Sequence, residues 1–231
     1  MNAIITGATK GIGKAIALKL AQEGYNLAIC ARTETDLLAF KNELAHYNVK
    51  IIAIKADVSN KEEVYNFCTE VKNVYSKIDV LVNNAGIFMP GNLLEEEDKN
   101  FEYQSKINLN TPYYLSKYFG KIMRDQQSGH IFNICSIAST EIIDNAGSYS
   151  VTKAAILSLN NVLRKELSAY NVKVTAILPG STFTASWEGT SLNPDKFVQP
   201  EDIANSLYSI LNLSSGVNVD EIILKPLNFN T

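Results

Sequence analysis

Residues 3–14 read Ala-Ile-Ile-Thr-Gly-Ala-Thr-Lys-Gly-Ile-Gly-Lys and decide the fold of this chain. The residues before Gly7 predict a short buried strand, and an apolar helical pattern begins at Ile12. Gly7, Gly11 and Gly13 occupy the turn, where glycine permits positive φ and close approach of a ligand to the backbone. The first N–H groups of the helix would then face a pyrophosphate. The spacing Gly-x-x-x-Gly-x-Gly differs from Gly-x-Gly-x-x-Gly, and a merely tight turn is the alternative.

Strand-like and helix-like segments alternate along nearly the whole chain. We expect strands at 3–6, 27–31, 51–55, 80–83, 130–135, 172–178 and 221–224, and helices at 12–22, 35–47, 61–76, 100–126, 149–169 and 200–211. Most of the strands are continuous apolar runs, as in a parallel sheet covered on both faces. The pattern predicts an α/β fold: one Rossmann-like, doubly wound parallel sheet of about seven strands within a single domain, residues 1–231.

Composition excludes several classes of function. Of 231 residues, 46% are hydrophobic and 19% charged, and the net charge of −3 gives no reason to expect nucleic acid or an anionic membrane as partner. No apolar run approaches the roughly 18 residues that span a bilayer, and residues 1–7 do not resemble a signal peptide. Cys30, Cys68 and Cys135 fit core positions in a reducing cytoplasm. His46 and His130 have no metal-ligand spacing, so we expect no metal site.

The end of the second strand predicts which dinucleotide binds. An acidic residue at 30–33 would accept from a ribose 2′-hydroxyl, but the sequence has Arg32 there, and Lys10 stands in the glycine turn. Two cations suit a 2′-phosphate, which favours NADP(H) over NAD(H); the alternative is that both are solvated surface charges. Asp57 and Val58 follow the third strand, where a carboxylate would accept from the adenine amino group. The small residues around Asn84, Ala85 and Gly86 after the fourth strand leave room for a ribose.

A second group of residues predicts acid–base chemistry. Tyr149 and Lys153 are four residues apart at the start of a helical pattern, so both side chains lie on one face about one turn apart. An ammonium group beside a phenol favours the phenolate, which makes a weak acid useful near neutral pH. Ser136, thirteen residues before Tyr149, follows an apolar strand. Its hydroxyl could hydrogen-bond the same substrate atom as the Tyr149 hydroxyl.

Together these motifs resemble the short-chain dehydrogenase/reductase family over essentially the whole chain. They are Thr6-Gly7-x3-Gly11-Ile12-Gly13, Asn83-Asn84-Ala85-Gly86, Asn108, Ser136, Tyr149-x3-Lys153 and Pro179-Gly180. The resemblance implies that Tyr149 is the catalytic acid or base, that Lys153 binds the nicotinamide ribose, and that Ser136 orients the carbonyl. It also implies that Asn108 kinks a helix and holds a water of the proton relay.

The resemblance also implies a cofactor site. Thr182 and Thr184, after Pro179-Gly180, would contact the nicotinamide carboxamide. The complete expected set is Gly7, Thr9, Lys10, Gly11, Ile12, Gly13, Arg32, Asp57, Val58, Asn84, Ala85, Gly86, Tyr149, Lys153, Pro179, Gly180, Thr182 and Thr184.

The segment before the last expected helix departs from the family pattern, and the pocket rim bears on the substrate. The segment 184–200 is short and carries the only tryptophan, Trp187; we expect a mobile flap with Trp187 or Phe183 near the substrate, or else an indole that covers the core. The expected pocket rim is largely apolar and favours a neutral or apolar carbonyl substrate. It comprises Ile87, Phe88, Met89, Ser139, Glu141, Ile142, Ile143 and Phe183.

The sequence therefore predicts an NADP(H)-dependent oxidoreductase that interconverts a small ketone or aldehyde and an alcohol. A 3-oxoacyl thioester reductase is an alternative, although the Gly-Gly ending common in such enzymes is missing. A catalytically silent NADP(H)-binding regulator is a further alternative; a hydrolase is disfavoured by the lack of a Gly-x-Ser-x-Gly elbow. The resemblance implies a homodimer or homotetramer paired through helices 100–126 and 149–169, and the small apolar run 154–159 suits either that interface or the sheet.

Overall fold

The computed structural model describes residues 1–187 and 189–227. Seven parallel strands form one sheet in the order β3-β2-β1-β4-β5-β6-β7. They are β1 (Asn2–Thr6), β2 (Asn26–Ala31), β3 (Ile51–Lys55), β4 (Val80–Asn83), β5 (Gly129–Ile134), β6 (Val172–Pro179) and β7 (Glu221–Leu224). The strand order reverses direction at β1, which is flanked by β2 and β4, and this confirms the doubly wound Rossmann-like sheet.

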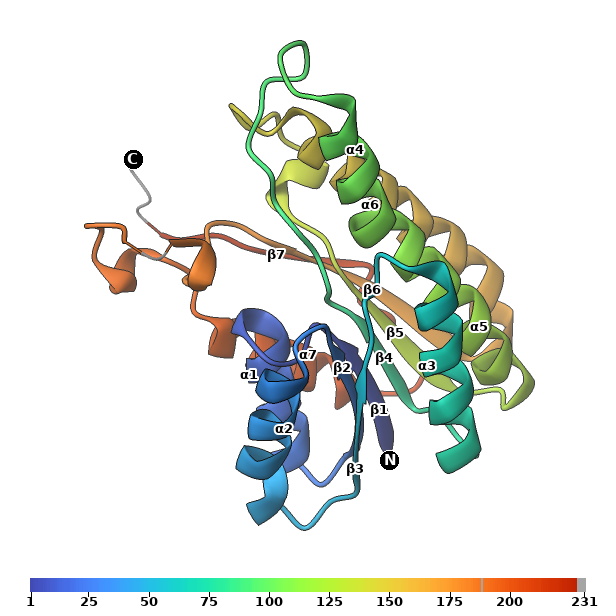
Figure 1. The fold of residues 1–231 in the computed structure, drawn as a ribbon. Coiled ribbons are helices and arrows are strands. Elements are labelled where there is room, and N and C mark those ends of the chain that lie inside the picture. The colour runs from blue at the N-terminus through green and yellow to red at the C-terminus, as the bar shows by residue number, and fades with distance from the viewer. Residues whose placement is uncertain (188, 228–231) are drawn as a thin grey trace.

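Helices cover both faces of the sheet (Figure 1). The helices are α1 (Gly11–Gln22), α2 (Glu34–Glu43), α3 (Lys61–Val74), α4 (Asp98–Ser105), α5 (Thr111–Asp125), α6 (Gly147–Leu167) and α7 (Pro200–Leu211). Helices α1, α2 and α7 enclose one core with Ile5 and Leu27, whereas α3 and α5 enclose the other with Ile4 and Leu81. Neighbouring residues of a strand point to opposite faces, so β1 contributes to both cores.

The long helix expected at 100–126 is interrupted. Helix α4 begins at Asp98, a π-helical segment runs over Lys106–Asn110, and α5 follows from Thr111. Asn108 lies inside the π segment, which agrees with the expectation that it marks a kink. The other differences are small: the expected helix at 35–47 ends at Glu43 and continues as a 3-10 turn, Leu44–His46, and α6 begins two residues earlier than expected.

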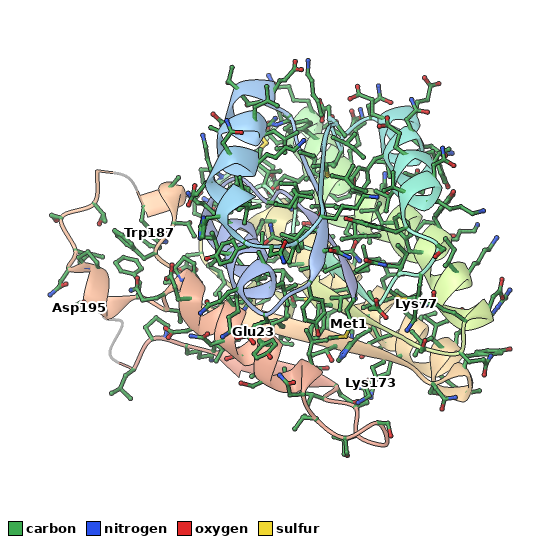
Figure 2. All side chains as sticks on the ribbon, turned by 90° about the horizontal axis from the view of Figure 1, so that it is seen from below. Met1, Glu23, Lys77, Lys173, Trp187 and Asp195 are labelled. Carbon is green, nitrogen blue, oxygen red and sulfur yellow. The ribbon has the colours of Figure 1, made fainter. Side chains whose placement is uncertain are left out.

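The segment after β6 projects from the rest of the chain. Figure 2 shows Trp187 and Asp195 on this projection, and it forms two 3-10 turns, Ala185–Trp187 and Pro194–Lys196. The Trp187 ring lies edge-on to Phe197, with centroids 4.8 Å apart, and Phe197 is buried. Trp187 also lines a hollow of about 700 Å³ with Leu18 of α1 and Pro200 of α7. The indole therefore contacts a buried ring of its own segment and faces a hollow beside α1 and α7, and the contact with Phe197 favours the core-covering alternative.

Within residues 1–187 and 189–227, no helix is both long enough and apolar enough to cross a bilayer. The same residues contain no group of three or more His, Cys, Asp or Glu side chains arranged to hold a metal ion.

His130 predicts a pH dependence of stability. The imidazole is buried beside Phe132 and its Nε2 lies 2.8 Å from the Thr175 hydroxyl. Burial, assisted by the nearby charge of Lys173, lowers the pKa of His130 from 6.5 to about 3. The unfolded chain therefore binds a proton between those pH values that the folded chain does not, so the free energy of unfolding falls as pH drops below 6.5.

The expected slope from this group approaches about 1.4 kcal/mol per pH unit. Urea unfolding of wild type and His130→Gln between pH 7 and 4 measures it: the variant should lose this component of the slope. His46→Gln is the control, since His46 is exposed. Equal slopes for wild type and His130→Gln would contradict the prediction.

Candidate active site

The glycine turn after β1 has the geometry of a phosphate-binding turn. Gly7 and Gly11 have backbone φ angles of +64° and +53°, which residues other than glycine rarely adopt. A Cβ on Gly13 would lie 2.3 Å from the Gly7 carbonyl oxygen, so Gly13 serves close packing of α1 against the turn. The three glycines therefore have two tasks: two allow the backbone conformation and the third allows the helix to approach.

Asn84 holds this turn from the neighbouring strand. Its Nδ2 donates to the main-chain oxygens of Thr6 and Gly7 at 2.8 and 3.1 Å, and Thr6 Oγ1 accepts from the N–H groups of Asn84 and Ala85. The side chain of Asn84 is thus engaged with the glycine turn. This task was not expected from the sequence, because the partner carbonyls lie 77 and 78 residues away.

A cleft of about 420 Å³ lies at the carboxyl ends of the strands. Eleven of the expected cofactor residues line it: Gly7, Thr9, Lys10, Gly11, Ile12, Arg32, Val58, Asn84, Ala85, Gly86 and Thr184. Gly13, Asp57, Tyr149, Lys153, Pro179, Gly180 and Thr182 are not among its lining residues, which all belong to the described part of the chain. A cleft at this edge, next to the reversal of strand order, is where open α/β sheets bind ligands.

Two cations lie at the Arg32 end of the cleft. Lys10 Nζ lies 3.1 Å from Asp36 Oδ2, and Arg32 NH1 donates to the Tyr103 hydroxyl at 2.9 Å. Asp36 and Tyr103 were not expected here from the sequence. Asp36 follows the end of β2 by several residues, and Tyr103 comes from α4, so only folding places them beside the cations.

Asp57 organises its own loop. Its Oδ1 accepts from the Ser59 N–H at 2.9 Å, and its N–H donates to Glu63. The carbonyl oxygen of Val58 accepts from the Thr111 hydroxyl at the start of α5, which ties this loop to the helix that packs beside α3.

The segment after β6 closes the cleft at its other end. The Gly180 N–H donates to the Leu224 carbonyl at 2.7 Å, and the buried Thr182 hydroxyl donates to the Gly180 carbonyl. A Cβ on Gly11 would lie 3.1 Å from the Thr184 methyl group, so Thr184 covers the glycine turn. Thr184 therefore lies at the cleft, whereas the Thr182 side chain is turned to its own backbone.

Lys153 and Tyr149 lie on the same face of α6. Lys153 is buried, its Nζ donates to the Ile134 carbonyl at 3.0 Å, and Nζ lies 5.6 Å from the centroid of the Tyr149 ring. The Tyr149 ring is partly exposed and meets Phe88 edge-on, with centroids 5.0 Å apart. The end of β5 thus fixes the ammonium group near the phenol, as the four-residue spacing predicts.

Ser136 follows β5 at the start of a 3-10 turn, Ile137–Ser139. Its Oγ accepts from the Ala138 N–H at 3.1 Å, and its own N–H donates to Ser139 Oγ. An accepting hydroxyl keeps its proton for donation to another atom. Ser136 and Lys153 are both tied to the end of β5, the lysine through the carbonyl of Ile134.

Asn108 joins three parts of the site. Its Oδ1 accepts from the Ile87 N–H at 2.8 Å, and its Nδ2 donates to the Ile87 carbonyl and to Thr152 Oγ1. Thr152 lies on α6 between Tyr149 and Lys153, and it donates to the Tyr149 carbonyl. The side chain of Asn108 therefore locks the loop after β4 to the helix that carries the tyrosine.

One pair at the pocket rim comes from distant segments. Lys225, which follows β7, makes an ion pair with Glu141. The Lys225 backbone lies against Gly180, since a Cβ added to Gly180 would be 3.5 Å from Lys225 Cα. The sequence indicated Glu141 as a charged exception on an apolar rim, but it gave no signal for its partner 84 residues away.

The cysteines near the site are unsuited to nucleophilic chemistry. Burial raises the pKa of the Cys30 and Cys135 thiols to about 12, and the thiolate is the reactive form. Among the expected catalytic residues, Tyr149, Lys153 and Ser136 carry an exchangeable proton on a hydroxyl or ammonium group.

Known proteins match this chain over most of its length. A family model described as short chain dehydrogenase matches residues 1–194. An uncharacterized oxidoreductase of Staphylococcus aureus (strain N315) is 33% identical over 225 residues, 97% of this chain and 96% of that protein.

Solved structures also match over nearly their whole length. The alcohol dehydrogenase of the archaeon Thermococcus sibiricus, complexed with 5-hydroxy-NADP, matches with a TM-score of 0.91 and 29% identity over 100% of this chain and 98% of that one. A metagenomic short-chain oxidoreductase in complex with NADP matches with a TM-score of 0.86 and 27% identity over 99% and 98%. With these matches over a seven-strand parallel sheet, the chain belongs to the short-chain dehydrogenase/reductase family of NAD(P)-dependent oxidoreductases.

Proposed function

We propose that this protein is an NADP(H)-dependent oxidoreductase that reduces a ketone or aldehyde to an alcohol, or catalyses the reverse. The observation that carries the proposal is the buried Lys153 ammonium group, which the Ile134 carbonyl holds 5.6 Å from the Tyr149 ring. Proton transfer from a phenol to a carbonyl oxygen leaves a phenolate, and an adjacent fixed cation stabilises that charge. Ser136 donates a hydrogen bond to the same oxygen, and Asn108 keeps the helix of Tyr149 in place.

The cleft fits a dinucleotide. A Cβ at Gly7 would lie 3.1 Å from Ala85 Cα, so the glycine turn can pack this closely against the loop after β4 only with glycine in place. The diphosphate would lie on residues 7–13, the adenosine between Arg32 and Asp57-Val58, and the nicotinamide between Asn84–Gly86 and residues 179–184. A bound nicotinamide supplies or accepts the hydride, and this chain moves the proton.

The two cations at one end of the cleft support NADP(H) rather than NAD(H). Arg32 bonds the Tyr103 hydroxyl, and the Lys10 ammonium group is paired with Asp36. Because Lys10 is exposed, it can exchange this carboxylate for a bound phosphate. A guanidinium and an ammonium group together bind a 2′-phosphate by charge-assisted hydrogen bonds. The two matching structures with an NADP-type ligand support the same preference.

Arg32→Ala should weaken NADPH binding about 10-fold to 100-fold, because a hydrogen bond to a charged group contributes about 1.5–3 kcal/mol. NADH binding should change by less than about threefold, since NADH lacks the phosphate. Fluorescence titration of both cofactors measures the two effects.

Asp36→Asn should have the opposite effect on cofactor binding, because it removes a negative charge beside the same site. It should leave NADH binding unchanged and strengthen NADPH binding. Equal weakening of both cofactors by Arg32→Ala would contradict the 2′-phosphate assignment.

The pocket rim supports a neutral, apolar substrate. Phe88 lies against the Tyr149 ring and is 47% exposed, and Ile142 on the facing loop is 94% exposed. The charged rim residue Glu141 is paired with Lys225. Phe183 was expected on this rim, but its ring packs toward Phe197, with centroids 5.6 Å apart.

The test of the function is NADPH oxidation, followed by absorbance, with a panel of ketones, aldehydes, 3-keto acids and an acetoacetyl thioester. Turnover of simple ketones or aldehydes would support the proposal. Turnover of the thioester alone would support the 3-oxoacyl reductase alternative. Tight NADPH binding without turnover across the panel would support the regulator.

We further propose that residues 1–231 act as one domain in a homodimer or homotetramer in the cytoplasm. The outer faces of α4, α5 and α6 carry half-exposed apolar side chains, namely Phe101, Tyr113, Val151 and Val162. Within the run 154–159, Ile156 and Leu157 are buried with residues of β6, so these two side chains serve the sheet. Light scattering would give the number of subunits.

A further inference from the structure

The helix that carries Tyr149 lacks a cap of its own. Ala146 precedes α6 and has no polar side chain, and the first turn, Gly147-Ser148-Tyr149-Ser150, contains no acidic residue. The first N–H groups of a helix have no partner within it and need acceptors from elsewhere. Tyr149 is the third residue of this helix, so its position depends directly on how the first turn is held.

The acceptors come from the loop between β4 and α4, about 52 residues away. The carboxylate oxygen Oε1 of Glu96 accepts from the Ser148 N–H at 2.9 Å and also from the Ser148 hydroxyl. The Gly91 carbonyl accepts from the Gly147 N–H at 2.9 Å. Glu96 therefore takes the place of the missing N-cap, and a negative charge at a helix N-terminus is favourable.

The loop is shaped to bring Glu96 to this point. A Cβ on Gly147 would lie 2.8 Å from the Leu93 nitrogen, and a Cβ on Gly91 would lie 2.9 Å from Glu96 Cβ. The Gly91 N–H also donates to the Asn145 carbonyl, which pairs the loop with the chain just before α6. The other oxygen of Glu96, Oε2, is buried without a hydrogen-bond partner among the described residues, so the carboxyl group lies inside this contact.

The contact also joins the two walls of the pocket. Helices α4 and α6 lie side by side (Figure 1), and the loop between β4 and α4 that contains Glu96 also carries Phe88, whose ring meets Tyr149. Asn108 fixes the start of the same loop through Ile87, and Glu96 fixes its end. Both attachments act on α6, one at Thr152 and the other at Ser148.

We infer that Glu96 is a positioning residue for catalysis: as the external N-cap of α6 it sets the place of the Tyr149 hydroxyl relative to Ser136 and Lys153. This inference rests on the proposed function, in which Tyr149 is the acid. Glu96 is not among the described residues that line the cleft, and its carboxylate bonds Ser148, so its effect is on kcat and not on cofactor binding.

The test compares Glu96→Ala, Glu96→Gln and Glu95→Ala. Glu95 is the adjacent exposed carboxylate and serves as the control. Glu96→Ala should lower kcat about 10-fold to 100-fold while the NADPH dissociation constant stays within about twofold, since misplacement of a catalytic group costs rate and not remote binding. Glu96→Gln keeps an acceptor oxygen for the Ser148 N–H and should restore kcat to within about fivefold of wild type. Glu95→Ala should match wild type.

Three results would overturn the inference: unchanged kcat in Glu96→Ala, an equal loss in Glu95→Ala, or loss of NADPH binding together with kcat in Glu96→Ala. Tyr149→Phe is measured alongside. If Tyr149→Phe is inactive and Glu96→Ala is normal, the positioning role alone fails; if Tyr149→Phe is active, the proposed function fails.

Discussion

Tyr149→Phe is expected to lower kcat about 10³-fold, the middle of the range for loss of a general acid or base. The phenyl ring keeps the edge-on contact with Phe88, and Lys153 keeps its bond to the Ile134 carbonyl, so the fold and the cleft are retained. NADPH binding should therefore remain within about twofold of wild type. Steady-state kinetics with the best substrate of the panel, together with a cofactor titration, measure both quantities.

Tyr170→Phe is the matched control. Tyr170 is a partly exposed tyrosine in the 3-10 turn Ser168–Tyr170, at the far end of α6 from Tyr149. The Tyr170→Phe variant should keep the kcat of wild type. If Tyr149→Phe kept more than about a tenth of wild-type kcat, Tyr149 would not be the group that transfers the proton.

Gly13→Ala is expected to have the largest effect on stability. In an exposed helix, alanine in place of glycine would gain up to about 1 kcal/mol. At residue 13 the new Cβ would lie 2.3 Å from both the Gly7 carbonyl oxygen and Asn84 Nδ2, and a main-chain oxygen cannot move without displacing the turn. Overpacking of this kind costs about 3 kcal/mol, so the clash outweighs the gain in helix propensity. NADPH binding should weaken as well, because the displaced turn forms the diphosphate site.

Gly216→Ala provides the control for this change. A Cβ on Gly216 would meet no described atom within 4 Å. The free energy of unfolding of the Gly216→Ala variant should therefore differ from that of wild type by less than about 0.5 kcal/mol. Urea unfolding of the two variants compares them directly. A Gly13→Ala variant as stable as wild type would show that α1 can move away from the turn at little cost.

Much of the fold could be read from the sequence because its signals are local. The apolar run of β1, the glycines after it and the alternation of strands with helices each depend on neighbouring residues. The alternation predicted a doubly wound parallel sheet but not the order of its strands, and all seven strands are where the pattern predicts them, within one or two residues. The spacing of Tyr149 and Lys153 on one helix face is equally local, and the structure has both on one face of α6.

Other predictions depended on distant contacts and were incomplete. The helix expected at 100–126 contains a π segment because Asn108 turns inward to bond Ile87 and Thr152. Gly13 and Asn84 were expected beside the cofactor; Asn84 lines the cleft, and both residues also serve the packing of the glycine turn, which the sequence did not indicate. Trp187 was expected near the substrate or over the core, and only its contact with Phe197 favours the second.

The sequence by itself determined the α/β fold, the family and the identity of the residues that match the family's motifs, because each of these is carried by periodicity or by spacing within a short segment. Only the tertiary structure decided which side chains surround them: Asp36 beside Lys10, Tyr103 beside Arg32, Lys225 on Glu141 and Glu96 at the start of α6. These pairs join segments that are separated by about 25 to 84 residues, and no local pattern encodes them. They form because parallel strands and their crossover helices bring the following loops to one edge of the sheet, where charged and polar groups must find partners.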